Sequence, residues 1–450
     1  MSIEYKIGIS KVNKRTGVLD VLFEKDTNEG YTKSLVSEDR YFTLSFKKDT
    51  LYTDVEKADS KIAIARELWK EFQIDTVIIN LPSALLYDKI ALEHILSNIV
   101  RSFFVNIYKE TSTIIVTHSG NAFNDLVKDN ASMIRKVQAA RLMSMLPANE
   151  ATPEKIAIRL QKFFKKIPKV TTKVLKHTYL YKHEFNLIRA VGEGAINPPC
   201  MLVVERIVSP KYPTVCIIGK GITFDSGGLA IKSYKGIIKM KFDKIGAINA
   251  SMSLLHLLEN KEMDHVNLVG IFPFAENAIS EKAVHPGDVV KSYLGKTVEI
   301  IDPDAEGRLI LADALAYARK YHPTLVIDIA TLTGHAEKIN CWHYGYYFAR
   351  PDSLKREFET LTNDIGERMI PMPTWDDYNE ILKSPVADLI NSPSKCSDAF
   401  VAALFLKEFV PEKSDWIHID VTHEFDGNVP KGNGIRSIIA IAKQAIQKKK

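Results

Sequence analysis

The sequence predicts an α/β protein with a small N-terminal α/β domain and a larger C-terminal α/β domain, whose mixed sheet is flanked by helices. The length of 450 residues exceeds that of an ordinary single domain. Short apolar runs alternate with stretches in which apolar residues recur at helical spacing. In the C-terminal part the apolar runs are continuous, which is typical of strands in a sheet covered on both faces.

Residues 1–145 are expected to form the N-terminal domain. Apolar runs between turn residues predict strands at Tyr5–Ile9, Val18–Phe23, Tyr41–Phe46, Thr76–Pro82 and Thr113–Thr117. Helical spacing predicts helices at Lys61–Phe72, Lys89–Tyr108 and Asn121–Leu146. This part contains no recognisable catalytic constellation, so we expect it to have a regulatory or assembly role.

Residues 146–170 are expected to form a linker made of a turn and a helix, with Thr152 as N-cap and Pro153 at the first helical position. Residues 171–450 are expected to form the larger domain. Its predicted strands are Lys173–Leu175, Met201–Val204, Thr214–Ile218, Val266–Phe272, Leu325–Ile329 and Ile417–Val421. Its predicted helices are Ala247–Leu258, Ile310–Tyr321, Phe400–Phe409 and Ser437–Gln447.

The composition is that of a soluble globular protein, with 46% hydrophobic and 26% charged residues. The net charge of +5 is small for this length and does not by itself indicate nucleic acid. The four cysteines are scattered without CxxC or zinc-finger spacing, so we expect no disulfide framework and a reducing compartment. No segment resembles a signal peptide or a membrane span, so the cytoplasm is the expected location.

A carboxylate-rich segment, 302–308, precedes the predicted helix Ile310–Tyr321. Asp304 and Glu306 are two positions apart, so in an extended segment their side chains leave the backbone on the same side. Two adjacent carboxylates repel each other, and a divalent metal is the usual solution. The alternative is a solvated acidic turn whose charge complements the helix dipole. Alone, the segment leaves both interpretations open.

A glycine-rich segment, 219–228, follows the predicted strand Thr214–Ile218 and contains Lys220 and Asp225. It lies where open α/β sheets bind ligands, at the carboxyl end of a strand. A phosphate loop is disfavoured because Lys220 is followed by Gly221 and an extended run, not by a hydroxyl residue and a helix.

Charged residues continue beyond this segment, and each has an ordinary structural explanation. Lys232 can be a surface lysine, and Asp243 can cap the helix that follows it. Lys239, Lys241 and Lys244 are interpreted as a solvated face. Residue by residue, this region therefore does not establish a site.

Taken together, the segments resemble the leucyl aminopeptidase family of two-zinc exopeptidases. The motifs that carry the resemblance occur in the family's order: Gly192–Gly194, Pro198–Pro199, Gly219–Gly228, Lys232, Met240–Asp243, Ala275–Asn277, Pro286–Val289, Asp304–Leu309 and Asp328–Gly334. They cover most of residues 140–440. The N-terminal domain is similar to that of the family only in its length and α/β pattern.

The resemblance implies a metal-dependent aminopeptidase with two divalent ions per subunit, zinc or manganese, with magnesium as a further candidate. Asp225 and Glu306 would bridge the ions, Asp304 would bind one, and Asp243 and Lys220 would bind the other. Four carboxylates balance two dications, and hard oxygen ligands suit all three metals. Because only a neutral amine can donate to a metal, the pKa of Lys220 would have to move from about 10.4 to near 7.

The resemblance also implies roles in catalysis and substrate binding. Lys232 would stay cationic and stabilise the oxyanion of the tetrahedral intermediate. Arg308 would hold a bicarbonate ion as general base, because a planar guanidinium binds such an anion through two hydrogen bonds. The peptide substrate would contact Met240, Thr331, Leu332 and Gly334, with Met240 in the side-chain pocket. The subunits would assemble into a homohexamer.

The chain departs from the family pattern at three places. Thr422-His423 stand where Ala-Gly is expected, Ser397-Asp398 replace a glycine pair before a late helix, and Asp302-Pro303 replace Asn-Thr. The first substrate pocket is therefore expected to be narrower or more polar than a leucine pocket.

Two other functions fit parts of the sequence. A nucleic-acid-binding or architectural role on the same fold would use the mild positive charge, but basic residues do not cluster beyond the tail 448–450 and the site lysines. Nucleic acid is therefore not expected as a partner. A two-metal phosphoesterase is disfavoured by the lysine ligand and by the lack of histidine ligands.

Overall fold

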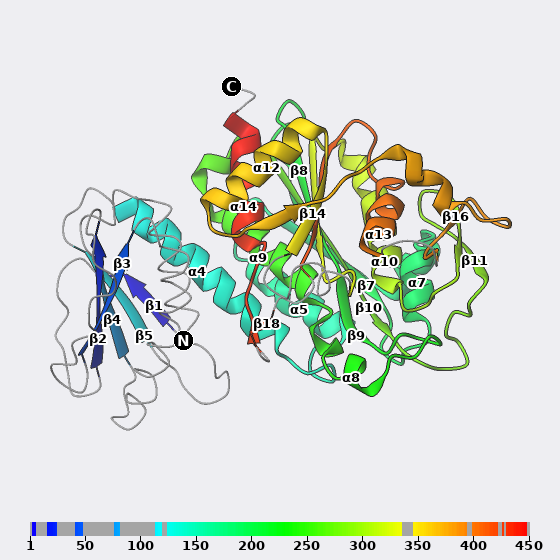
Figure 1. Ribbon diagram of the computed structural model, residues 1–450, viewed down its shortest axis with the longest axis horizontal. Coiled ribbons are helices and arrows are strands. Elements are labelled where there is room, and N and C mark those ends of the chain that lie inside the picture. Colours follow the sequence, from blue (N-terminus) through cyan, green and yellow to red (C-terminus); the bar gives the residue numbers. More distant parts are fainter. Residues whose placement is uncertain are drawn as a thin grey trace. The chain divides into compact units, whose positions relative to one another are not determined.

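The chain divides into two compact units, residues 1–138 with 364–366, and residues 139–363 with 367–450 (Figure 1). The computed structural model describes residues 2–5, 16–24, 41–47, 76–81, 113–118, 124–334, 345–393, 398–421, 425–426 and 429–447. The division falls inside helix α4 (Asn124–Ser144). The predicted helices Lys61–Phe72 and Lys89–Tyr108 lie outside the described residues.

The first unit contains a five-stranded sheet in which all neighbouring strands are parallel. In spatial order the strands are β1 (Ser2–Tyr5), β5 (Thr113–His118), β4 (Thr76–Leu81), β2 (Thr16–Glu24) and β3 (Tyr41–Lys47). The four strands predicted between Val18 and Thr117 are thus confirmed. The strand predicted at Tyr5–Ile9 is only tested at Tyr5, because residues 6–15 lie outside the described residues.

The second unit is built on a mixed sheet, as predicted. In spatial order its strands are β15 (Met369–Pro371), β14 (Gly345–Arg350), β17 (Asp415–Asp420), β13 (Leu325–Ala330), β8 (Thr214–Gly219), β10 (Asn267–Asn277), β7 (Cys200–Arg206) and β6 (Thr171–Leu175), and β9 (Gly221–Asp225) pairs with the end of β10. The central strands β17, β13, β8 and β10 are parallel, whereas β14 and β7 are antiparallel to their neighbours β17 and β10. Every residue of β8 and β13 is buried, which explains their continuous apolar sequences.

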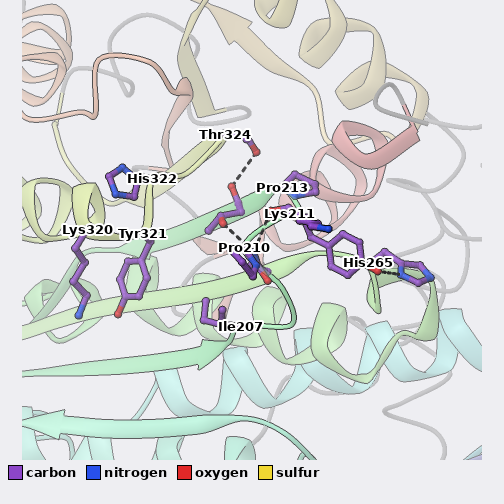
Figure 2. A pocket seen from close by; sticks show the side chains of 12 residues that line it. Ile207, Pro210, Lys211, Pro213, His265, Lys320, Tyr321, His322 and Thr324 are labelled. Carbon is purple, nitrogen blue, oxygen red and sulfur yellow. Dashed lines mark hydrogen bonds between the residues drawn. The ribbon is translucent and has the colours of Figure 1, made fainter.

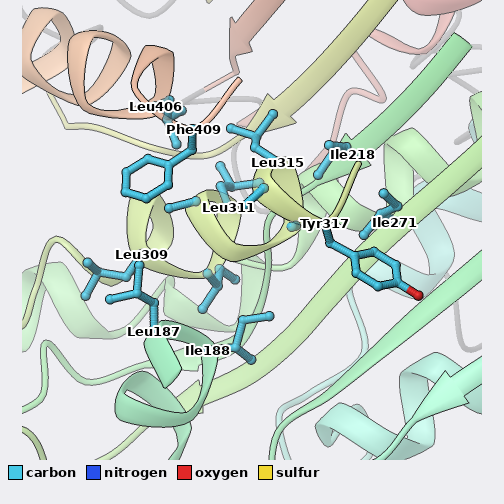
Figure 3. Close-up of a cluster of buried hydrophobic side chains, with 14 of the residues drawn as sticks. Leu187, Ile188, Ile218, Ile271, Leu309, Leu311, Leu315, Tyr317, Leu406 and Phe409 are labelled. Carbon is cyan, nitrogen blue, oxygen red and sulfur yellow. The ribbon is translucent and has the colours of Figure 1, made fainter. Parts of the chain in front are cut away.

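Helices cover both faces of this sheet (Figure 1). One face carries α5 (Pro153–Phe164), α9 (Ile245–Glu259) and α14 (Ile435–Gln447). The other carries α7 (Asn186–Gly192), α10 (Glu306–Ala318) and α13 (Asp398–Lys407). The core beneath α10 takes alternate residues of β8, Cys216 and Ile218, because successive strand side chains point to opposite faces (Figure 3).

The remaining elements are shorter or lie at the periphery. They are α6 (His177–Lys182), α8 (Tyr234–Ile237), α12 (Asp352–Asp364), η1 (Met240–Phe242), η2 (Lys261–Met263), η3 (Arg319–Tyr321), η4 (Asp376–Leu382), the small sheet β11 (Asp288–Lys291), β12 (Thr297–Ile300) and β16 (Leu389–Ile390), and the pair β18 (Phe425–Asp426) and β19 (Val429–Pro430). None of the helices in the described part of the chain combines the length and apolar character that a membrane crossing needs.

Residues 146–170, expected to form a linker turn and helix, fall within the second unit. Helix α5 begins at Pro153, as predicted, with Thr152 in the N-cap position. Its apolar face is fully buried through Ile156, Ala157, Leu160 and Phe164. This face contacts β6, β7 and β10. Burial of these four apolar side chains stabilises the packing of α5 against the sheet.

Asp313 in α10 joins three segments and yields a stability prediction. Its buried carboxylate accepts hydrogen bonds from the backbone N–H groups of Leu187 (3.0 Å), Ile188 (3.1 Å) and Tyr293 (2.8 Å). Asp313→Ala leaves three N–H groups without this acceptor, so we expect the free energy of unfolding to fall by about 3 kcal/mol. Urea unfolding measures this, with exposed Asp377→Ala as a control that stays near wild type. Equal midpoints for both variants would contradict the prediction.

Candidate active site

The central parallel strands bring the predicted site residues to one edge of the sheet. Strand β8 ends at Gly219, directly before Lys220, and β9 ends at Asp225. Strand β13 ends directly before Thr331. In open α/β sheets, ligands bind at this carboxyl edge.

The five predicted metal ligands come together there. One carboxylate oxygen from each of Asp225, Asp304 and Glu306 lies within 4.8 Å of the others. Lys220 Nζ lies 2.8 Å from Glu306 Oε1 and 2.9 Å from Asp243 Oδ2. Asp304 is partly exposed, whereas the other four residues are buried. The four acids are called the carboxylate cluster below.

Three carboxyl groups of the carboxylate cluster have raised pKa values, because burial and neighbouring carboxylates disfavour their charged forms. Burial, followed by the charges of Asp225 and Glu306, raises the pKa of Asp304 to about 7. Burial also raises the pKa of Asp243 and that of Glu306. Burial lowers the pKa of Lys220, but the neighbouring carboxylates outweigh it and raise that pKa overall. Among the protein groups alone Lys220 is therefore an ammonium, and its role as a neutral metal ligand stays a prediction.

The donor set fits hard divalent cations. In the described part of the chain, Asp243 Oδ2, Asp304 Oδ1 and Glu306 Oε1 are buried, and each lies 2.5 to 2.9 Å from a lysine ammonium. Two ammonium groups do not offset the charge of four carboxylates, and divalent cations would do so. Carboxylates with one amine are suitable ligands for zinc, manganese or magnesium.

Lys232 contacts the other pair of carboxylates. Its Nζ lies 2.8 Å from Asp225 Oδ2 and 2.5 Å from Asp304 Oδ1. Burial lowers the pKa of Lys232, but Asp225, Glu306 and Asp304 together raise it above its usual value. Lys232 lies directly beside the proposed ligands, and its role at the oxyanion stays a prediction.

The acidic segment is not extended, so the predicted geometry was wrong although the residues do meet. Asp304 lies in a turn, and Glu306 is the first residue of α10, which begins before the predicted start at Ile310. A turn and a helix start bring the two carboxylates together, not strand alternation. Asp243 does not cap α9 either, because Lys244 holds that position.

Lys244 is fully buried, which corrects its assignment to a solvated face. Its Nζ donates hydrogen bonds to the backbone oxygens of Leu146 (2.9 Å) and Lys241. Burial lowers the pKa of Lys244 to about 7. The Lys244 ammonium is therefore bound by two backbone carbonyl groups and not by solvent. These hydrogen bonds stabilise the loop that carries Asp243.

Two glycines leave room for the site. A Cβ at Gly307 would lie 2.5 Å from Cε of Lys220, whose position is fixed by its ion pairs. Gly227 has φ +86, and a Cβ there would lie 2.4 Å from the oxygen of Ala230. A side chain at Gly307 would displace Lys220, and one at Gly227 would displace the backbone between Asp225 and Lys232.

The loop after β13 connects the cluster to the predicted substrate residues. Thr331 Oγ1 donates to Asp243 Oδ1 at 2.7 Å, and its backbone oxygen accepts from Lys220 Nζ at 2.8 Å. The N–H of Leu332 donates to Asp420 Oδ1 at 3.1 Å. Thr331 is therefore part of the site. The contacts of Thr331 and Leu332 with a substrate stay predictions.

Met240 and Gly334 complete the predicted substrate set. Met240 begins η1, three residues before Asp243, and Gly334 is exposed. Their contacts with a substrate also stay predictions. Thr422 and His423, which depart from the family pattern, lie outside the described residues.

Asn277 and Asp420 also contact residues of the site, although the sequence pattern predicts no role for either. Asn277 Nδ2 donates to Asp225 Oδ1 at 2.8 Å and to the backbone oxygen of Pro303 at 3.1 Å, so it joins the two ligand segments. Asp420 accepts hydrogen bonds from Leu332 and from Thr333 Oγ1. Asn277 belongs to the motif Ala275–Asn277, so the resemblance to the family could have indicated its role. The role of Asp420 depends on the parallel pairing of β13 with β17.

Arg308 lies in the first turn of α10 and is buried. Its Nη1 donates to the backbone oxygen of Asn391 at 2.8 Å, and its Nη2 forms an ion pair with Asp398 Oδ1. Asp398 is the first residue of α13. The anion beside Arg308 in this structure is therefore a carboxylate of the same chain.

A pocket of about 840 Å³ lies at the opposite edge of the sheet (Figure 2). Its lining includes Thr214 and Asn267, where β8 and β10 begin, and Thr324, directly before β13. Because the carboxylate cluster lies at the other ends of these strands, the pocket is not part of the candidate active site.

Comparisons with known proteins show the family of this chain. Residues 138–439 match the catalytic domain of the cytosol aminopeptidase family. A probable cytosol aminopeptidase of Roseiflexus castenholzii is 36% identical over 293 residues, which are 64% of this chain and 59% of that protein. One of Koribacter versatilis is 36% identical over 344 residues, which are 73% of this chain and 66% of that protein. The matches therefore span less than two thirds of these relatives.

Solved structures show the same fold. A leucine aminopeptidase of Caenorhabditis elegans aligns over the whole of both chains with a TM-score of 0.86 and 22% identity. The bottromycin maturation enzyme BotP, solved in complex with Mn, covers 95% of this chain and 99% of its own, with a TM-score of 0.82 and 23% identity. Since the matched residues 138–439 form most of the chain and contain the carboxylate cluster, the chain belongs to the cytosol aminopeptidase family.

Proposed function

We propose that the protein is a metal-dependent aminopeptidase that hydrolyses the N-terminal residue from peptides. The observation that carries the proposal is the carboxylate cluster with its two lysines at the carboxyl edge of the sheet. The proposed ligands of two divalent ions are Lys220, Asp225, Asp243, Asp304 and Glu306. Zinc and manganese are the leading candidates, with magnesium as a third, and a structural relative was solved with Mn.

The protein groups around the cluster have distinct proposed roles. Bound ions would polarise the scissile carbonyl and activate a water molecule. Lys232 would donate a hydrogen bond to the oxyanion, since it is a cation that lies between Asp225 and Asp304. The backbone of Thr331, Leu332 and Gly334 would bind the amino end and main chain of the substrate, with Met240 beside its side chain.

An anion held by Arg308 is proposed as the general base. Arg308 lies two residues after Glu306, and its guanidinium has the planar geometry that binds carboxylates and carbonates. Bicarbonate, which the resemblance implies, is one such anion. Assembly into a homohexamer and a cytoplasmic location also remain proposals, and light scattering of the purified protein tests the first of them.

Metal removal tests the proposed function directly. Treatment with 1,10-phenanthroline is expected to abolish hydrolysis of leucyl-p-nitroanilide, and added Zn²⁺ or Mn²⁺ is expected to restore it. The circular dichroism spectrum should not change, because the lysines still offset part of the cluster's charge. Activity that survives in protein shown by atomic emission to be free of metal would contradict the proposal.

A further inference from the structure

Arg308 is paired with a carboxylate that the sequence itself supplies. The Arg308 side chain is 1% exposed, and its Nη2 contacts Asp398 Oδ1 while its Nη1 is bound to Asn391. By the resemblance to the leucyl aminopeptidase family, Asp398 stands where that pattern has a glycine. A glycine there has no side chain to offer Arg308, whereas this chain places an anion directly on the guanidinium.

Asp398 has charged or polar neighbours on α10 and β14. It forms an ion pair with Arg308, two residues after Glu306 in α10. Burial, followed by the charge of Asp420 and more weakly that of Asp398, raises the pKa of Tyr346 in β14. The Tyr346 hydroxyl is hydrogen-bonded to Thr333 of the loop after β13. The Asp398 side chain is 33% exposed, so its carboxylate is accessible to a water molecule, unlike the buried Arg308.

Asp398 differs from the carboxylate cluster and from Asp420 in its partner, because it forms an ion pair with an arginine that is not a proposed metal ligand. The members of the carboxylate cluster are proposed metal ligands, and each contacts a lysine. Asp420 is buried, and its oxygens accept hydrogen bonds from Leu332 and Thr333. We propose that Asp398, oriented by Arg308, is the general base of the peptidase and takes the place of a free bicarbonate ion. This inference rests on the proposed function.

The proposed step is a proton transfer from water. The water oxygen forms a bond to the scissile carbonyl carbon while one of its protons passes to the Asp398 carboxylate. That proton then passes to the leaving nitrogen as the C–N bond breaks, so the products are a free amino acid and a shortened peptide. Asp398 is again ionised at the end of the cycle, ready to accept a proton from the next water molecule.

Chemical rescue tests the inference in protein loaded with Mn²⁺ and kept in buffer purged of carbon dioxide. Wild type is expected to show the same kcat with and without added bicarbonate. Asp398→Gly should lose about 10²-fold or more in kcat and recover when bicarbonate fills the space beside Arg308. Asp398→Asn should lose as much but should not recover, because its amide still occupies that space.

Binding of ¹³C-labelled bicarbonate to metal-free protein, followed by NMR, gives a second measurement that does not depend on activity. Asp398→Gly should bind the ion, whereas wild type and Asp398→Asn should not. The proposal is overturned if wild type binds bicarbonate as tightly as Asp398→Gly, or if wild type needs bicarbonate for activity. If metal-loaded wild type hydrolyses no aminoacyl substrate, the proposed function fails, yet the binding comparison still decides whether Asp398 occupies the Arg308 site.

Discussion

Glu306→Gln is expected to lower kcat/KM by about 10³-fold or more and to reduce the metal content of the protein. Glu306 is buried at the start of α10, beside the carboxylates of Asp225 and Asp304. A neutral amide cannot balance a dication, and loss of a metal's contribution costs several kcal/mol in the transition state. About 4 kcal/mol corresponds to roughly three factors of ten in rate. Steady-state kinetics and atomic emission on the same samples measure both effects.

The fold should survive this substitution, because the glutamine oxygen can still accept a hydrogen bond from Lys220 Nζ, which lies 2.8 Å from Glu306 Oε1. Glu281→Gln is the matched control, since Glu281 is exposed on a loop. It should retain wild-type kinetics and metal content. If Glu306→Gln kept both its activity and its metal, Glu306 would not be a ligand.

Lys232→Met is expected to lower kcat by about 10² to 10³-fold with little change in KM. The methionine keeps most of the length of the side chain but removes the cation that would face the oxyanion, and loss of one such donor has this cost. An interaction made only in the transition state affects kcat and kcat/KM equally, which sets the expected pattern. The variant's kinetics should be measured together with its metal content.

Metal content separates a role in catalysis from a role in holding the ions. Lys232 contacts Asp225 and Asp304, so its removal takes a competing cation away from two proposed ligands. The variant should therefore bind metal at least as well as wild type. Lys235→Met, at an exposed position in α8, is the control and should behave as wild type. Loss of metal in Lys232→Met would refute the assigned role.

The sequence correctly predicted that the site lies at the carboxyl edge of the sheet. It did not predict the turn and helix start that bring Asp304 and Glu306 together. Lys220 and Asp225 could be placed because they follow a strand whose apolar run is unmistakable. The start of α10 was hidden because its N-cap is Ala305, which lacks a capping side chain. An apolar pattern that begins at Leu309 therefore suggested a later start.

Contacts between residues far apart in the sequence could not be predicted, for a different reason. Lys244 stands in a run of charges that resembles a solvated face, and its acceptor Leu146 is 98 positions away in sequence. Arg308 and Asp398 are 90 positions apart, and their contact depends on the packing of α10 against α13. Periodicity and local propensity describe neighbours along the chain, so they carry no information about such partners.

The two lysines among the carboxylates bear on the order of folding and of the proposed metal binding. Lys220 and Lys232 act as internal counterions, so the chain can complete its folding before any ion binds. This differs from small zinc domains, in which the unliganded chain stays unfolded. Binding of the proposed ions would then be a separate and later event at a site that has already folded. The ion that a given molecule carries would accordingly reflect which divalent ion its surroundings supply.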